Sequence, residues 1–541
     1  MVATYYDTAE GALRKGGVTL SVKAGDRQRT QVAASDAVSA SSVLKVGAAP
    51  DLTRIRDANL RARTLHLVSD ASMAPVFQAD IKIRAYPLAV EGVPVEMAIA
   101  IGQISASDIA DGLIEVTFRA GDRMAAYSVA EALAGAVPVS VERSDFVARG
   151  YALAHGQRAK AALAQDVTLD GGWSARRGFV AVLRNCLDQL AANEAAFAAG
   201  GGSEVIHQLR VAIRRMRAAF SAFSSILPPD ETADFRADLQ WLQRIFGPLR
   251  DWDVFHNETL AALRAALPNH DGLRELASEV RATRAQALVL AREALTSTRH
   301  GLFQVRLERW LEKESGEEGP RLVEFAANAL AKRDRKLRRA GKGLDDSAPD
   351  RLHDIRIAAK KARYAAEFFR DLFGGKATRK YLRALRRIQD GLGAMNDANM
   401  ARRLVGGVRP GDREMAALLD GWFAARIVIS RSDVDALWRK FERAPRYWKD
   451  EARARSFGVT NARSSPRAGA ISAQCATSKS NTAKAAVGNF SCMAVEAKAS
   501  PLPARMPARS SRPGLCPITS RQDASSSARR RRSSSSSALA R

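Results

Sequence analysis

A motif in the middle of the chain occurs twice, and the distance between its copies restricts the fold. Residues 207–217 read HQLRVAIRRMR, and residues 353–363 read HDIRIAAKKAR. A second pair of motifs, FGPLRD ending at Asp251 and LGAMND ending at Asp397, keeps the same spacing, because 353 − 207 and 397 − 251 both equal 146. Two separate motifs with one offset predict a tandem duplication of a helical unit, with the two bundles related by a pseudo-two-fold axis.

The first copy of the motif predicts an amphipathic helix with a cationic stripe. At about 100° per residue, the basic side chains that follow His207 lie within a narrow stripe on one side of the helix. These are Arg210, Arg214 and Arg217. The opposite side carries the expected core residues, which are Leu209, Ile213, Met216, Phe220 and Phe223.

The second copy repeats this arrangement. His353, Arg356, Lys360 and Arg363 form the stripe, and the apolar side consists of Ile355, Ala359, Ala362, Ala366 and Phe369. No acidic residue lies between His207 and Phe223 or between Ile355 and Ala366. Solvated helix faces usually mix charges of both signs, because like charges at i,i+4 destabilise a helix. The stripes therefore predict an anionic ligand, while two ordinary solvated basic faces are the alternative.

The residue types in the stripes suit phosphate. Arginine binds phosphate oxygens in bidentate fashion, and lysine supplies a point charge. The candidate binding residues are His207, Arg210, Arg214, Arg215, Arg217, His353, Arg356, Lys360, Lys361 and Arg363. Each histidine lies near the expected start of its helix, where free N–H groups favour anions, and hydrogen bonding to phosphate is a better prediction for it than metal binding.

Further residues are expected to support the site. Asp251 and Asp397 either hold arginines of a facing helix by ion pairing or serve as ordinary capping or surface residues. The second half alone carries additional basic residues, which are expected to add to the field and include Arg335, Arg338, Arg339, Arg383 and Arg387.

The net charge agrees with a polyanionic partner. The chain of 541 residues has a formal charge of +26, and a surplus of this size indicates nucleic acid, anionic lipid or inorganic phosphate chains as partner. Aromatic residues make up 6% of the chain, which disfavours single-stranded nucleic acid because such sites stack bases on aromatic rings.

The periodicity of the sequence predicts an α+β protein of several domains. Residues 1–155 are β-rich, with short strands at Val18–Val22, Thr64–Val68, Ile81–Ala85, Val95–Ile101 and Ile114–Phe118 and a helix at Met124–Ala134. A linker at 156–172 leads to an all-helical domain at 173–449. Residues 450–541 are rich in Ser, Ala, Arg and Pro, and we expect a disordered basic tail there.

The cysteines and the first residues bear on the compartment. The chain has four cysteines and no C-x-x-C pair, which disfavours a disulfide framework and a zinc site. The first residues show no secretory signal, and the longest apolar run is too short to cross a bilayer. These features predict a soluble cytoplasmic protein that does not insert into membranes.

The duplicated motifs resemble those of the CHAD domain. That family repeats an early histidine followed by basic residues, with a Leu-Gly-x-x-Asn/Arg-Asp element after each copy, as at 203–223, 242–255, 349–369 and 386–400. The resemblance covers about 173–449. It implies two pseudo-symmetric four-helix bundles with a basic central channel that binds inorganic polyphosphate, and an association with polyphosphate granules.

The N-terminal part resembles a CYTH domain, the triphosphate tunnel fold. Tyr5-Tyr6-Asp7-Thr8, the stretch from Leu13 to Leu20 and the segment from Arg143 to Tyr151 carry the match. The family's opening Glu-x-Glu-x-Lys is missing, its later Glu-x-Glu keeps Glu115 but has Thr117, and Asp145 stands at a usually basic position. Metal-assisted phosphate hydrolysis needs several carboxylates, so the resemblance implies a partial tunnel, open at an edge, without catalytic residues or a bound metal.

The sequence thus predicts a polyphosphate-binding protein that is not an enzyme and needs no cofactor. The alternatives are a residual metal-dependent triphosphatase or polyphosphatase and a nucleic-acid-binding protein. A weak affinity for nucleic acid is compatible with the basic stripes.

Overall fold

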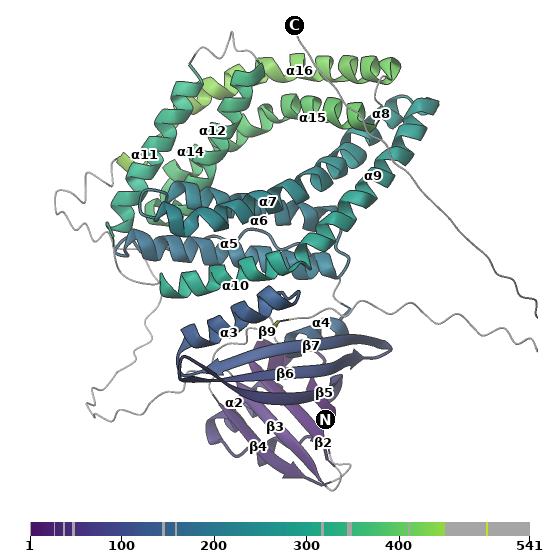
Figure 1. The fold of residues 1–541 in the computed structure, drawn as a ribbon, viewed down its shortest axis with the longest axis vertical. Helices are drawn as coiled ribbons and strands as arrows, with labels where there is room; N and C mark the ends of the chain where they lie inside the picture. The colour runs from purple at the N-terminus through teal and green to yellow at the C-terminus, as the bar shows by residue number, and fades with distance from the viewer. Residues whose placement is uncertain are drawn as a thin grey trace, which may run out of the picture. The chain divides into compact units, whose positions relative to one another are not determined.

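The structure is a computed structural model. It describes residues 2–25, 28–35, 38–45, 49–142, 146–156, 160–314, 319–342, 349–408, 412–449 and 494–495. Most of the tail predicted at 450–541 lies outside the described residues, and so do Arg143 and Asp145. The prediction of an α+β protein is confirmed, because an antiparallel sheet precedes a long helical region (Figure 1).

The N-terminal part is a seven-stranded antiparallel sheet with the order β4-β3-β2-β1-β5-β6-β7. Its strands are β1 (Val2–Thr8), β2 (Val18–Ala24), β3 (Arg29–Ser35), β4 (Ser39–Leu44), β5 (Met73–Val90), β6 (Val93–Ala106) and β7 (Ile109–Ala120). Four of the five predicted strands lie within β2, β5, β6 and β7. In the part of the chain that the structure describes, this sheet is open, with β4 and β7 at its edges.

The predicted strand Thr64–Val68 is wrong, because this segment ends the helix α2 (Ala58–Val68). Asp57 caps the helix by accepting a hydrogen bond from the backbone N–H of Leu60 at 2.7 Å. The helical register buries Leu60, Thr64 and Val68 on one side. The alternation of apolar and polar residues at the end of α2 is, by itself, a pattern typical of a strand. The N-cap at Asp57 is the signal that the segment is helical.

Helices cover parts of both faces of the sheet. The helix α3 (Arg123–Ala136), which confirms the prediction at Met124–Ala134, packs on Val116 and Phe118 of β7. The helix α4 (Phe146–Ala154) brings Tyr151 against Phe77, with ring centroids 5.4 Å apart. The short elements of this part are α1 (Ala12–Lys15), η1 (Leu52–Arg54) and β8 (Val141–Glu142), which pairs with β9 (Ala494–Val495).

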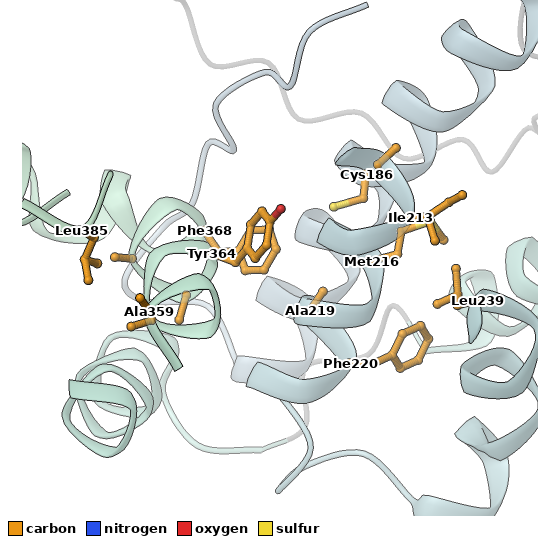
Figure 2. Close-up of a cluster of buried hydrophobic side chains, with 14 of the residues drawn as sticks. Cys186, Ile213, Met216, Ala219, Phe220, Leu239, Ala359, Tyr364, Phe368 and Leu385 are labelled. Carbon is orange, nitrogen blue, oxygen red and sulfur yellow. The ribbon is translucent and has the colours of Figure 1, made fainter. Parts of the chain in front are cut away.

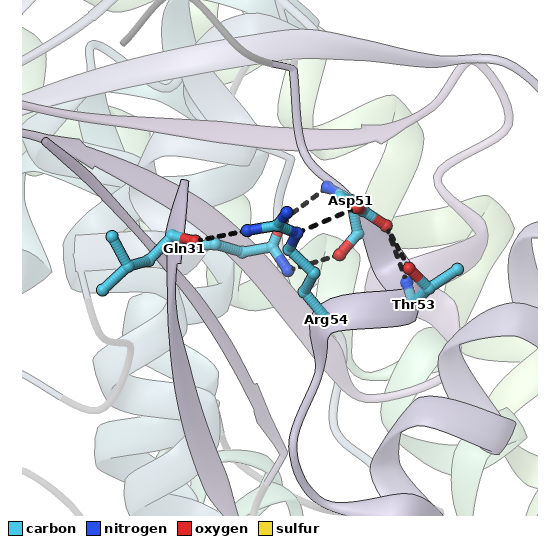
Figure 3. A network of polar contacts seen from close by, with 5 residues as sticks. Gln31, Asp51, Thr53 and Arg54 are labelled. Carbon is cyan, nitrogen blue, oxygen red and sulfur yellow. Dashed lines mark hydrogen bonds and ion pairs between the residues drawn. The ribbon is translucent and has the colours of Figure 1, made fainter. Parts of the chain in front are cut away.

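A polar network fastens the turn before α2 to the sheet (Figure 3). The buried side chain of Gln31 donates to the backbone carbonyl of Asp51 at 2.8 Å and accepts from its N–H at 2.7 Å. The carboxylate of Asp51 accepts from Thr53 and pairs with Arg54 at 3.3 Å. Both backbone groups of Asp51 are satisfied in this way, so the turn is held by β3.

The helical part reproduces the sequence duplication. The bounds of α6 (Ser203–Ala222) and α12 (Pro349–Phe368) differ by 146 at both ends, since 349 − 203 and 368 − 222 both equal 146. The helices α5 (Ala175–Ala198) and α9 (Asp271–Leu295) correspond to α11 (Leu322–Ala340) and α16 (Arg413–Glu442). The remaining elements are α7 (Pro229–Val254), η2 (Phe255–Leu260), α8 (Ala261–Ala266), α10 (Thr298–Lys313), α13 (Arg370–Phe373), α14 (Gly375–Gly391) and α15 (Gly393–Val408).

The two halves share one apolar core. The helices α6 and α12 pack against each other, and so do α5 and α11. Phe223 and Phe369, which are equivalent in the duplication, are both 0% exposed and have ring centroids 5.4 Å apart. Figure 2 shows Ala219 of α6 and Phe368 of α12 in this core. Contact between equivalent residues is what a pseudo-two-fold axis between the halves requires.

The helix α10 contacts the sheet domain. Val305 is 0% exposed and joins the apolar cluster of α3, and Gly301 lies so close to Val139 that a Cβ would come within 2.3 Å of its carbonyl oxygen. Glu131 of α3 pairs with Arg306 and Arg309 of α10 at 2.7 and 2.8 Å. Among the described residues, no helix is long and apolar enough to span a membrane.

A glycine substitution tests the packing of α4 on the sheet. A Cβ at Gly150 would lie 2.3 Å from the Phe77 ring, which is 2% exposed and cannot retreat into solvent. We expect Gly150→Ala to lower the free energy of unfolding by about 1–3 kcal/mol because it overpacks this core. Gly135→Ala in α3, where no atom lies within 4 Å of the added methyl group, is the control. Equal stability of the two variants in chemical denaturation would contradict this packing.

Candidate functional site

The predicted core faces of α6 and α12 are confirmed, which fixes the direction of the basic stripes. Leu209, Ile213, Met216, Phe220 and Phe223 are at most 1% exposed. In the second copy the same holds for Ile355, Ala359, Ala362, Ala366 and Phe369. Because these residues occupy one side of each helix, the stripe residues on the other side are left partly accessible.

The cations of the two halves come close enough to interact with each other. Burial lowers the pKa of Arg356, and the positive charge of Arg214 on the other half lowers it further. Burial also lowers the pKa of Arg210, on which Arg214, Arg250 and Arg356 act in the same direction. Charges from α6 and from α12 therefore belong to one cluster, the "cationic cluster", whose members are Arg210, Arg214, Arg250, Arg356 and Lys360.

Lys360 shows how strongly this cluster is charged. Its pKa falls to about 7, first because burial disfavours the ammonium form and then because Arg356, Arg214 and Arg210 repel a further positive charge. The Nε atom of Arg214 is buried and has no hydrogen-bond partner in the described part of the chain. A buried donor without an acceptor is costly, and an anion placed between the helices would supply the acceptor.

Two carboxylates lie beside the cationic cluster. Asp251 is 3.5 Å from the Nη1 atom of Arg210, and its pKa is raised by burial although Arg210, Arg403 and Arg250 favour its ionised form. Asp397 favours the charged form of Arg356 and thereby opposes the lowering of its pKa by burial. Asp251 is thus paired with Arg210, and the role of both aspartates in holding the arginines for a ligand stays a prediction.

The backbone of Gly247, in the motif before Asp251, helps to position Arg210. Arg210 donates a hydrogen bond to the backbone carbonyl of Gly247 at 2.7 Å, and a Cβ at Gly247 would lie 3.4 Å from its Nη1 atom. A Cβ at this position would thus make only ordinary van der Waals contact with the guanidinium, and Gly247 contributes through its carbonyl oxygen. The motif positions Arg210 through Gly247 and Asp251 together.

The two histidines differ in their surroundings. His207 is partly buried, and its pKa is lowered by burial and by Arg250, while Glu204 acts in the opposite direction. His353 is exposed. No group of three His, Cys, Asp or Glu residues that could hold a metal ion occurs among the described residues.

Six of the ten candidate residues are not members of the cationic cluster, and besides the two histidines these are Arg215, Arg217, Lys361 and Arg363. Arg215 is 5% exposed and donates to Gln189 and Asn185 at 2.6 and 2.7 Å, so it is part of the packing between α5 and α6. Arg363 lies 3.8 Å from Glu367 of its own helix, and its charge also lowers the pKa of Lys360, less than the arginines of the cluster do. Arg217 donates a hydrogen bond to the side chain of Gln243. Lys361 is exposed and lies near Arg217.

The supporting residues fall into two groups. Arg338 is held by Asp334 at 2.9 Å, donates to the backbone carbonyl of Glu442 and lies over the Phe441 ring, so it joins α11 to α16. The other four are exposed on α11 and α14, and these are Arg335, Arg339, Arg383 and Arg387.

Sequence reasoning missed Arg250 and Arg403 as members of the site. Both act on Asp251, and Arg250 also donates to the hydroxyl group of Ser203 at 3.0 Å. Their counterparts at the offset of 146 are Asn396 and Asn257, so neither cation is repeated. Because neither cation occurs in both copies, the sequence repeat does not reveal them.

The arrangement of the site suits an anion with several charged groups in a row. Neighbouring stripe residues are about 5–6 Å apart along each helix, and two stripes meet in the cationic cluster. Two carboxylates offset only part of the positive charge. A ligand with one phosphate group could satisfy one or two of these cations, whereas a linear polyanion could satisfy the cluster and both stripes.

Comparison with known proteins agrees with this description. The family model of the CHAD domain matches residues 181–406. A crystal structure of the CHAD domain from the plant Ricinus communis is similar, with 32% identity and a TM-score of 0.47, over 53% of this chain and 98% of that one. PptA from Streptomyces chartreusis is also similar, with 17% identity and a TM-score of 0.37, over 50% of this chain and 99% of that one. No curated protein matches.

The family model begins in the second turn of α5 and ends in the last turn of α15, so it includes both basic stripes and the aspartates beside them. The sheet domain is not part of the match. Residues 181–406 are therefore a CHAD domain.

Proposed function

We propose that the helical domain binds inorganic polyphosphate between α6 and α12. The observation that carries this proposal is the cationic cluster, in which Arg214 of one half and Arg356 and Lys360 of the other repel one another. Repulsion in a partly buried site costs free energy, and a polyanion that lies between the helices removes this cost. The resemblance to the CHAD family implies the same ligand, inorganic polyphosphate.

Polyphosphate fits the site better than nucleic acid does. Every repeating unit of polyphosphate carries a negative charge and no base, so the chain can place an anionic group beside each cation of the stripes without a ring that must be stacked. The aromatic residues near the stripes are core residues, since Tyr364 is 5% exposed and Phe368 is 1% exposed. They are not available to stack on bases. In a competition experiment, polyphosphate should displace nucleic acid more effectively than the reverse.

For the sheet domain we propose a partial CYTH-like tunnel that does not hydrolyse triphosphate. Glu115 of β7 is 5% exposed, and Thr117, two residues later on the same strand face, offers no carboxylate. Asp7 is 1% exposed and accepts hydrogen bonds from the N–H groups of Thr8, Leu13 and Arg14, so it serves the turn into α1. In the described part of this domain no group of carboxylates could hold a metal ion, and we propose no cofactor.

Binding of a polymer would also determine where the protein is found. Polyphosphate accumulates in granules, and a protein whose helical domain holds such chains would be retained on them. We propose this association as a consequence of binding, through the cationic cluster rather than through the sheet domain.

Charge reversal on either half tests the shared site. We expect Arg210→Glu/Arg214→Glu and Arg356→Glu/Lys360→Glu to weaken polyphosphate binding by comparable factors of roughly a hundredfold, because each pair adds repulsion to the lost attraction. Arg281→Glu/Arg292→Glu, on the exposed side of α9, is the matched control. Affinity is measured by titration calorimetry, with helicity checked by circular dichroism. If one pair abolishes binding and the other has no effect, the halves do not share a site.

The low pKa of Lys360 predicts a pH dependence. At pH above 7 much of the free protein carries a neutral Lys360, and a bound polyanion favours its charged form, so binding takes up a proton. Affinity should therefore fall as the pH rises from 7 to 9, by at most about tenfold per pH unit for one proton. Lys360→Arg keeps its charge throughout and should flatten this profile. A profile that is flat in the unmodified protein would contradict the prediction.

The sheet domain should show no metal-dependent hydrolysis. We expect no release of phosphate from triphosphate by the intact chain with Mn²⁺ or Mg²⁺, because Glu115 alone cannot hold the ion. The measurement is a phosphate-release assay. Turnover that disappears in Glu115→Ala would reveal a residual hydrolase instead.

A further inference from the structure

The two halves of the helical domain differ at positions that the duplication makes equivalent. Leu187 and Leu190 of α5 are 4% and 1% exposed and belong to the core. Their counterparts in α11 are Arg333 and Lys336, since 333 − 187 and 336 − 190 both equal 146. Apolar core positions of the first half have thus become cations in the second.

A third position changes in the same direction. Arg215 of α6 is buried, donates to Gln189 and lies over the Phe368 ring at 5.9 Å. Its counterpart in α12 is Lys361, which is exposed. The counterpart of Gln189 is Arg335, which is also exposed, so the buried network of the first half is replaced by surface cations.

These cations form a cluster of their own. The pKa of Lys361 is lowered by burial and then by Arg333, Lys336 and Arg217, all of which are positively charged. Among the described residues, no carboxylate is one of the groups that shift the pKa of Lys361. On an ordinary solvated surface, acidic residues would be mixed with these cations.

The new cluster begins where the stripe of α6 ends. Arg217 is the last cation of that stripe. Arg333 reaches from α11 to the last turn of α6, where it donates to the backbone carbonyl and the hydroxyl group of Ser221 at 2.7 and 2.8 Å. A cation at a helix C-terminus is favourable by itself, which explains Arg333 but neither Lys336 nor Lys361.

We propose that Arg217, Arg333, Lys336 and Lys361 form a second polyanion contact, continuous with the cationic cluster, that binds the part of a long polyphosphate chain extending beyond α6 and α12. The proposal rests on the proposed function and adds a dependence on chain length. The stripe from His207 to Arg217 spans about 15 Å of helix at 1.5 Å per residue. Tripolyphosphate is shorter than the stripe and cannot occupy both contacts, whereas a long chain can.

Two exposed residues provide the test. We expect Lys336→Gln/Lys361→Gln to weaken the binding of long-chain polyphosphate roughly tenfold at low salt. The fall of log affinity with log salt should also become less steep, by about 1–2 in slope. Binding of tripolyphosphate should stay unchanged. Glutamine maintains the helices, and Arg281→Gln/Arg292→Gln removes two exposed charges from α9 as a matched control.

The outcomes separate this contact from the cationic cluster. Long-chain affinity equal to that of the control overturns the proposal. Equal losses for long-chain polyphosphate and tripolyphosphate also overturn it, because the two lysines would then belong to the first contact. Unmodified protein that binds neither ligand refutes the proposed function itself. Retained binding that is sensitive to both charge-reversal pairs of the cationic cluster but not to Lys336→Gln/Lys361→Gln refutes the second contact alone.

Discussion

The packing of α6 on α12 determines the rest of the helical domain. Burial of the apolar sides of these helices, with Phe223 against Phe369, gives the halves a common core. The same contact brings two cationic stripes together, and their repulsion opposes the packing. Asp251 and Asp397 offset part of this repulsion. The electrostatic repulsion in the ligand-free domain therefore lowers its stability. Any polyanion that binds the folded form stabilises it by mass action.

The duplication and the faces of α6 and α12 could be predicted from the sequence, because an offset of 146 and a helical period leave little freedom in placing side chains. The sheet was harder to predict. Thr64–Val68 alternates like a strand, and only the cap formed by Asp57 determines that it is helical. The central place of β1 in the sheet follows from long-range pairing with β2 and β5, which no local pattern reveals.

The residues of the site that depart from the repeat could not be predicted. Arg215 occurs within the basic motif but is buried, because Gln189 and Asn185 supply acceptors that only the folded α5 brings near it. Arg250 and Arg403 also belong to the site, but each has an asparagine at the equivalent position of the other half. A repeat identifies what the two halves share, whereas the differences between them emerge only from packing.

The surroundings of Lys360 have a chemical consequence. A lysine whose pKa is about 7 is largely a free amine in mildly alkaline solution, and a free amine is a nucleophile toward acylating reagents. An anion that restores the ammonium form removes that nucleophile. The reactivity of this one side chain thus reports whether the space between the two halves is occupied, without a label on the ligand.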